Sequence, residues 1–149
     1  MIDKDMIFLD EELKNKDEIF NYISERALEH GLISSKEEFL KSLYYRESLM
    51  STALDFNIAI PHAKSQAVEN DFISYMKLKE DIMRNEDDAN PTNQIFMIAV
   101  TEGGSNRHLK YIAEISRNLI DEDFRQSLKE AKSTEKIIAI LTSIKMEEE

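Results

Sequence analysis

The spacing of apolar residues in the first third of the chain predicts two helices. The first begins after Asn15, whose side chain suits an N-cap, and ends at Gly31. The second begins after Ser35, another N-cap residue, and runs close to Leu49. Each contains apolar residues at helical spacing: Ile19, Ile23 and Ala27 in the first, and Phe39, Leu40 and Leu43 in the second. Each helix therefore has one apolar face that can pack on a core.

The middle of the chain has the patterns of strands. Asp71 to Leu78 alternates between apolar and polar residues, and Ile95 to Val100 is a continuous apolar run typical of a central strand buried on both faces. The short apolar patch Met6 to Leu9 predicts either an added strand or a cap on the core. Between the strands, Lys79 to Asn93 is polar and acidic, which predicts a loop, and Ala63 to Val68 suggests a helical turn.

Three more helices are predicted after the central strand. Ser105 or Asn106 caps the first of them, Phe124 to Ala131 marks the second, and Ser133 caps the third. Helices interspersed with strands predict an α/β fold, or alternatively α+β, in which helices pack on a mixed sheet. The length of 149 residues suits one domain over residues 1–149.

Composition narrows the functional classes. The net charge of −11 argues against nucleic acid and anionic membranes as partners. The chain has no cysteine, which excludes disulfides, thiolate metal sites and cysteine nucleophiles. No apolar run is long enough to cross a bilayer, and the first residues lack the basic start of a signal peptide. We therefore expect a cytoplasmic protein without direct membrane insertion.

The segment Asn57 to Lys64, NIAIPHAK, is the strongest candidate for chemistry. A short apolar run ends at Pro61, whose fixed φ helps to aim the next residue, His62. A neutral imidazole accepts a proton, binds a metal or acts as a nucleophile, because its ordinary pKa is about 6.5. A lone Pro-His pair is nevertheless more often a turn with a solvated histidine, so its surroundings decide the interpretation.

Two further residues suit a phosphoryl group. Arg46 lies near the end of the second helix, and its planar guanidinium matches phosphoryl oxygens, although a surface salt bridge is the common alternative. His108 lies in the first turn of the helix after Asn106, where free amides and the helix dipole favour negative charge, although simple solvent contact is the alternative there.

Together these features resemble the enzyme IIA domain of the fructose and mannitol class of the bacterial phosphoenolpyruvate-dependent sugar phosphotransferase system. The resemblance follows the order of elements across nearly the whole chain. It rests on these matching positions: Arg46-Glu47, Ser51-Thr52, Ile58 to His62, and His108-Leu109. It implies a mixed, largely parallel sheet packed between helices.

The resemblance also implies a function. His62 would accept a phosphoryl group from the histidine-containing phosphocarrier protein and pass it to a cysteine of enzyme IIB during sugar uptake. Arg46 and His108 would support the phosphoryl charge, and Ser51 or Thr52 would donate hydrogen bonds to it. The chemistry requires no cofactor and no metal.

The chain departs from the family in the loop before His62. Relatives usually have glycines between the Ser/Thr positions and the AIPH motif, whereas Thr52 to Asn57 contains none. Asp55 and Asn57 tolerate left-handed conformations, so we expect them to replace the glycines in part.

Several alternative functions remain open. A regulatory, nitrogen-type relative would be phosphorylated without committing a sugar. From another class, an enzyme acting on a phosphodiester would use His62 as base and His108 as acid. A plain interaction module would leave the AIPH motif inert. A metal hydrolase has little support, because the three histidines lack ligand-like spacing.

Overall fold

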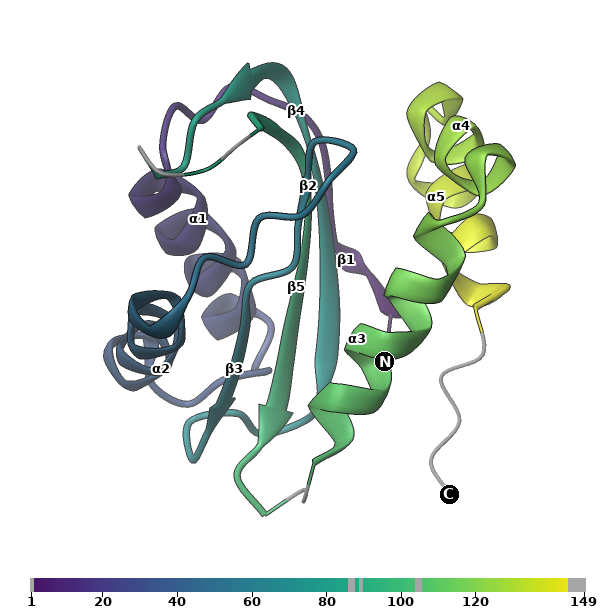
Figure 1. The fold of residues 1–149 in the computed structure, drawn as a ribbon. Coiled ribbons are helices and arrows are strands. Elements are labelled where there is room, and N and C mark those ends of the chain that lie inside the picture. The colour runs from purple at the N-terminus through teal and green to yellow at the C-terminus, as the bar shows by residue number, and fades with distance from the viewer. Residues whose placement is uncertain (1, 86–87, 89, 104–105, 145–149) are drawn as a thin grey trace.

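A computed structural model describes residues 2–85, 88, 90–103 and 106–144 of the chain (Figure 1). In chain order the elements are β1 (Ile2–Glu11), α1 (Lys16–Glu29), α2 (Lys36–Leu49), β2 (Ile58–Ala59), β3 (His62–Ser65), β4 (Phe72–Ile82), β5 (Thr92–Thr101), α3 (Arg107–Leu119), α4 (Glu122–Glu130) and α5 (Thr134–Thr142).

The predicted helices are confirmed, and their N-caps explain where they begin. The Asn15 side chain accepts a hydrogen bond of 2.9 Å from the backbone N–H of Glu18, and Ser35 does the same for α2. Ser133 caps α5 in the same way, as its sequence predicts. Asn106 occupies the N-cap of α3 without a side-chain cap bond, and Ser105, the other predicted cap, lies outside the described residues.

The strands form one mixed sheet in the order β1-β4-β5-β2, with β3 also pairing with β5. Only β4 and β5 are antiparallel to each other; the other pairs within the described sheet are parallel. The predicted fold class, a mixed and largely parallel sheet between helices, is therefore confirmed. Strand β5 is central, as its continuous apolar run predicts.

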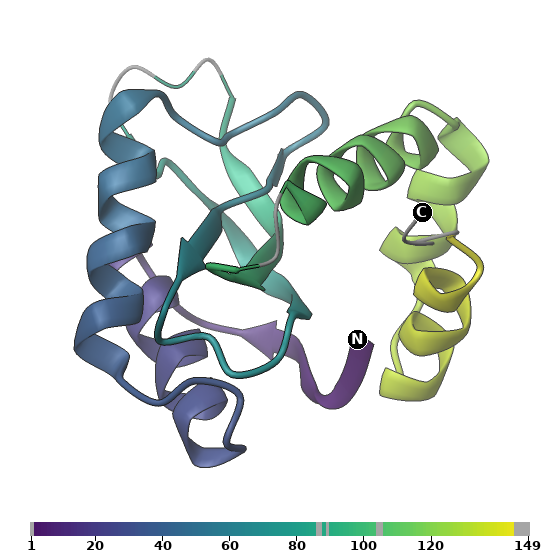
Figure 2. The same cartoon turned by 90° about the horizontal axis from the view of Figure 1, so that it is seen from below.

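Helices cover both faces of the sheet, with α1 and α2 on one side and α3, α4 and α5 on the other (Figures 1 and 2). Each side has its own core, because successive residues of a strand point to opposite faces. Met97 of β5 packs with the α1 and α2 side, whereas its neighbour Ile98 packs with the α3 side. Both residues are fully buried.

Two local predictions from the sequence are wrong. The predicted loop Lys79 to Asn93 is too long, because β4 continues to Ile82 and β5 begins at Thr92, where the two strands still pair. The predicted helical turn at Ala63 to Val68 begins instead as strand β3, which pairs in parallel with β5. In both places the hydrogen bonds of the sheet override local sequence preference. The patch Met6 to Leu9 lies within β1, the strand alternative.

The glycine-free loop adopts left-handed conformations at different residues from those predicted. Phe56 and Asn57 have φ values of 66° and 65°, whereas Asp55 has no positive φ. The prediction is therefore correct for Asn57 and wrong for Asp55. The two left-handed residues form the tip of a hairpin that is closed by a 2.7 Å hydrogen bond from Leu54 N–H to the Ile58 carbonyl. The position of the tip, rather than side-chain preference, selects the residues that need positive φ.

Candidate functional site

His62 stands at the edge of the sheet, where β2 and β3 are separated by Ile60 and Pro61. Proline has no N–H to donate to a ladder, so it suits this break in an edge strand, and β3 resumes pairing at His62 opposite Ile98. The Nδ1 atom of His62 lies 3.0 Å from the carbonyl oxygen of Ile60. Because a carbonyl oxygen only accepts, Nδ1 carries the proton and Nε2 carries the free lone pair.

Arg46 holds the other side of the imidazole. It lies in the last turn of α2, and its Nε donates a 2.9 Å hydrogen bond to His62 Nε2. Its Nη1 donates a 2.7 Å hydrogen bond to the Met50 carbonyl, which fixes the guanidinium at the end of the helix. The two bonds to His62, from Ile60 and from Arg46, agree on a single tautomer with Nε2 facing a cation.

A pocket of 560 Å³ opens in front of these two side chains. His108 and Lys64 also line it, and its lining contains no carboxylate among the described residues. The rings of His62 and His108 lie 5.9 Å apart, with 30° between their planes. Nδ1 of His108 is buried without a hydrogen-bond partner among the residues that the structure describes. The pocket is therefore locally basic in a chain whose net charge is −11.

Both histidines of the pocket favour their neutral forms. Burial lowers the pKa of His62 below its ordinary value, and the Arg46 charge lowers it further, against opposing effects of the Ile60 carbonyl and Glu47. Burial also lowers the pKa of His108, with added contributions from the charges of Lys64 and Arg46 and from His62 when it is protonated. At neutral pH the Nε2 lone pair of His62 is therefore free of a proton.

Behind this pocket lies a sealed ion pair. Arg84 Nη2 donates a 2.9 Å hydrogen bond to Glu47 Oε1, and both side chains are almost fully buried. Thr52 Oγ1 donates to the second oxygen of Glu47 and accepts from Arg84 Nη2. The backbone carbonyl of Thr52 in turn accepts a 3.0 Å bond from Ile60 N–H, next to the carbonyl that orients His62. The ion pair thus joins the end of α2 to the segment that carries the imidazole.

The structure places the predicted site residues in two groups. Arg46, His62 and His108 meet in one pocket. The hydroxyl of Thr52 is engaged with Glu47, and the Ser51 hydroxyl donates a 2.7 Å hydrogen bond to Asp88 Oδ1. Neither Ser51 nor Thr52 lines the pocket in this state.

Sequence reasoning missed two residues of this region. Lys64 lies two residues after His62 in β3, so both side chains project from the same face of the strand. If the segment after Pro61 had been predicted as a strand, Lys64 would have been recognised as a neighbour of His62 on the same face. Arg84 lies just after β4 in a segment predicted as loop, and nothing in its local pattern distinguishes it from a solvated arginine.

The described part of the chain was compared with the geometry of metal sites and of membrane-spanning helices. No group of three or more His, Asp or Glu side chains there is arranged to hold a metal ion. Among the described helices, none is both long enough and apolar enough to cross a bilayer.

Comparison with known proteins assigns the chain to one family. The family model described as "Phosphoenolpyruvate-dependent sugar phosphotransferase system, EIIA 2" matches residues 1–144. The chain is 33% identical over 141 residues to a fructose-specific EIIABC component of Bacillus subtilis, covering 95% of this chain but 22% of that relative. It is 30% identical over 140 residues to a fructose-specific EIIA component of Haloferax volcanii, covering 94% of this chain and 91% of that protein.

Solved structures share the fold. The nitrogen regulatory protein IIA-Ntr of Neisseria meningitidis superposes with a TM-score of 0.85 at 27% identity, covering 94% of this chain and 95% of that one. The mannitol IIA of Escherichia coli superposes with a TM-score of 0.79 at 22% identity, covering 95% and 99%. At that lower identity the mannitol protein supports the fold alone.

Proposed function

This chain belongs to the EIIA 2 family of the phosphoenolpyruvate-dependent sugar phosphotransferase system, and on that premise we propose that His62 is its phosphoryl carrier. The observation that carries the proposal is the tautomer of His62. Its Nδ1 proton is held by the Ile60 carbonyl, which leaves the Nε2 lone pair directed at the Arg46 guanidinium.

The proposed reaction has two steps at Nε2. In the first, the Nε2 lone pair attacks phosphorus on the phosphohistidine of the histidine-containing phosphocarrier protein. A new N–P bond forms, and the donor imidazole leaves with the electrons of its own N–P bond. In the second, a cysteine thiolate of enzyme IIB attacks the same phosphorus, an S–P bond forms, and His62 recovers its lone pair. The lowered pKa of His62 supports this role, because only neutral imidazole is nucleophilic.

Arg46 is the proposed electrostatic support. The transition state of phosphoryl transfer spreads negative charge over the equatorial oxygens, and a positioned guanidinium stabilises that charge. The Nε–H of Arg46 now bonded to Nε2 would turn to a phosphoryl oxygen once the N–P bond forms. His108 would contribute its Nδ1, which has no hydrogen-bond partner among the described residues, and the positive end of α3.

Exposed apolar residues around the pocket suit protein partners. Tyr45, Leu49, Met50 and Leu109 are all largely exposed, and Tyr45 and Leu109 also line the pocket. Phosphoryl donor and acceptor would dock here in turn, in the cytoplasm, with no cofactor or metal. The fructose-specific names of the relatives make fructose the first sugar to test.

A regulatory role is the second candidate. It is favoured by the likeness to the nitrogen regulatory IIA-Ntr protein, which covers nearly the whole of both chains at 27% identity. Such a protein would accept the phosphoryl group at the same histidine but would keep it, and its two forms would bind different targets.

One experiment tests both proposals. The chain is incubated with radiolabelled phosphoenolpyruvate, enzyme I and the phosphocarrier protein, and acid-labile label is counted. We expect label on the wild type and on His30→Ala, since His30 is an exposed histidine outside the pocket, but none on His62→Ala. Absence of label on the folded wild type, with a relay verified on a known EIIA, would refute the carrier role. Addition of a fructose-class enzyme IIB then separates the candidates, because transport requires the label to move and regulation requires it to stay.

A further inference from the structure

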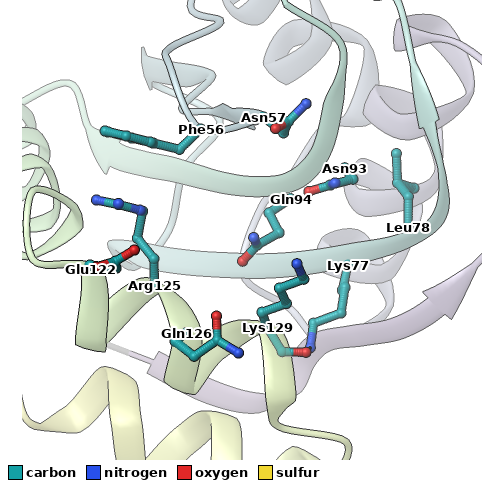
Figure 3. A pocket seen from close by; sticks show the side chains of 10 residues that line it. All are labelled: Phe56, Asn57, Lys77, Leu78, Asn93, Gln94, Glu122, Arg125, Gln126 and Lys129. Atoms are coloured by element: carbon teal, nitrogen blue, oxygen red, sulfur yellow. The ribbon is translucent and has the colours of Figure 1, made fainter.

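A second pocket, of 390 Å³, lies beside the start of β5, away from His62. The hairpin tip at Phe56 and Asn57 borders it on one side and α4 borders it on the other, with side chains of β4 and β5 between them (Figure 3). Its lining shares no residue with the lining of the His62 pocket. The two pockets are therefore separate sites.

The lining of this pocket carries a net positive charge, whereas the chain as a whole is negatively charged. Lys77, Arg125 and Lys129 contribute cations to its lining, and Glu122 is the one carboxylate among the described lining residues. The chain as a whole has 30 acidic residues against 19 basic ones, so such a concentration of positive charge stands out. A concave site with this local charge attracts anions.

An aromatic residue in a costly conformation forms one wall. Phe56 is half exposed and has a φ of 66°, which bulky side chains rarely adopt and which hairpin tips usually assign to Asn or Gly. Its ring stacks against the Arg125 guanidinium, whose central carbon lies 3.7 Å from the ring centroid. Strained residues often lie at functional sites, and here the Phe56 ring orders a cation beside the pocket.

Other contacts hold the binding groups in place. Arg125 Nη1 donates to the carbonyls of Leu119 and Ile120, at 2.6 Å and 3.1 Å, which ties the guanidinium to the end of α3. The Gln94 side-chain oxygen accepts a 2.6 Å bond from the Tyr75 hydroxyl, so the Gln94 amide nitrogen remains as a donor. The site is thus ordered before any ligand arrives, which lowers the entropic cost of binding.

Lys77 and Lys129 have different roles. Lys77 Nζ donates to the carbonyls of Leu128 and Ala131, at 2.6 Å and 2.7 Å, so it supplies a fixed charge while its hydrogen bonds serve the end of α4. Lys129 is exposed on α4, and its ammonium is directed toward the sheet in Figure 3. Arg125 and Lys129 are therefore the groups placed to contact an anion directly.

We propose that this pocket binds a small organic anion, with its carboxylate or phosphate between Arg125 and Lys129 and its body against Phe56. The volume suits a compact metabolite-sized molecule. Glu122 accepts hydrogen bonds, which favours a body bearing hydroxyl groups over a bare inorganic ion.

The test is a titration of the full chain followed by backbone amide NMR at constant ionic strength. The probes are glucose 6-phosphate, gluconate, inorganic phosphate and neutral glucose. We expect saturable shifts at Phe56, Gln94 and Arg125 with an organic anion and none with glucose. Saturation by glucose 6-phosphate alone, or by gluconate alone, would identify phosphate or carboxylate as the preferred head group.

Variants separate binding from folding. Lys129→Gln and Arg125→Gln each remove one cation and should weaken binding by about tenfold or more. Phe56→Asn places a residue that tolerates positive φ at the hairpin tip, so binding should weaken while the melting temperature is kept or raised. Lys41→Gln, at an exposed position on α2, makes the same charge change elsewhere and should bind as the wild type does.

Three outcomes would overturn the proposal. Shifts that rise linearly without saturation indicate only the ionic atmosphere. Equal affinity for inorganic phosphate and the organic anions indicates an adventitious ion only. Equal binding by the wild type and all the pocket variants places the ligand elsewhere. Phosphoryl transfer to His62 is measured separately and stands or falls on its own.

Discussion

Arg46 and Glu47 are neighbours at the end of α2, yet they serve two very different regions. Arg46 faces an open pocket and donates to a neutral imidazole, and no carboxylate of the described residues is paired with it. Glu47 faces inward and is sealed with Arg84, where the exposed fractions of the side chains are 2% and 1%. One arginine therefore keeps its charge available, and the other has its charge neutralised.

The difference shows that a guanidinium takes its role from what it faces. Arg84 is committed to Glu47 and Thr52, and through Thr52 it holds the backbone at Ile60. Among the described residues, the groups that Arg46 contacts carry no negative charge, so its own charge remains available to an arriving anion. We accordingly expect loss of Arg84 to damage stability and loss of Arg46 to damage chemistry.

The largest effect is expected from Arg84→Ala. Removal of one partner leaves Glu47 buried and unpaired, which costs about 3–5 kcal/mol in the free energy of unfolding. Urea denaturation followed by circular dichroism measures it. The double variant Glu47→Gln with Arg84→Met removes both charges and should recover most of the loss. A loss below about 1 kcal/mol for Arg84→Ala, as for an exposed pair, would contradict the sealed character of this region.

Arg46→Ala should show the opposite pattern. Phosphoryl transfer should slow by about 100-fold, the usual result of removing one donor to a developing oxyanion. The free energy of unfolding should change by less than about 1 kcal/mol, because Arg46 is only partly buried and pairs with no carboxylate of the described residues. Arg117→Ala, at an exposed arginine of α3, is the matched control and should transfer normally. An unaltered rate in Arg46→Ala would remove Arg46 from the proposed mechanism.

The fold was largely predictable from the sequence because its strongest signals are local. Asn15 and Ser35 cap their helices through hydrogen bonds to residues only three positions away. The six consecutive apolar residues Ile95 to Val100 indicate that β5 is buried on both faces. The segment after His62 was misread because its strand character comes from pairing with β5, which is remote in sequence. A strand of four residues is too short to show a periodic pattern, so its pairing with β5 cannot be predicted from its own sequence.

The residues of the candidate site show the same difference between local signals, which the sequence reveals, and long-range contacts, which it does not. His62 could be selected as a candidate because the short apolar run and Pro61 before it occur in the same chain as Arg46-Glu47 and His108-Leu109, in the order of the family motifs. Arg84 was not, because its burial depends on a carboxylate 37 positions away. The tautomer of His62 also needed the structure, since it depends on where the Ile60 carbonyl points.

A third prediction concerns the titration of His62. Burial and the Arg46 charge lower the pKa of His62, so the imidazole should lose its proton at a pH below the ordinary value of about 6.5. Phosphoryl transfer should therefore decline only when the pH falls below this lowered pKa. Arg46→Ala removes one of the two effects, and the midpoint should rise. NMR titration of the His62 ring, assigned with His62→Gln, measures both midpoints. A midpoint unchanged by Arg46→Ala would show that the guanidinium does not act on the imidazole electrostatically.

The smallest effect is expected from Ser51→Ala. In the free protein the Ser51 hydroxyl is bound to Asp88, so it would reach a phosphoryl oxygen only after it releases that carboxylate. One hydrogen bond gained and one lost differ by about 1 kcal/mol at most, so transfer should slow by less than about fivefold. Single-turnover phosphorylation by the phosphocarrier protein measures the change. A slowing as large as that of Arg46→Ala would mean that Ser51 belongs to the open pocket in the phosphorylated state, and that the boundary between the two regions moves when the phosphoryl group arrives.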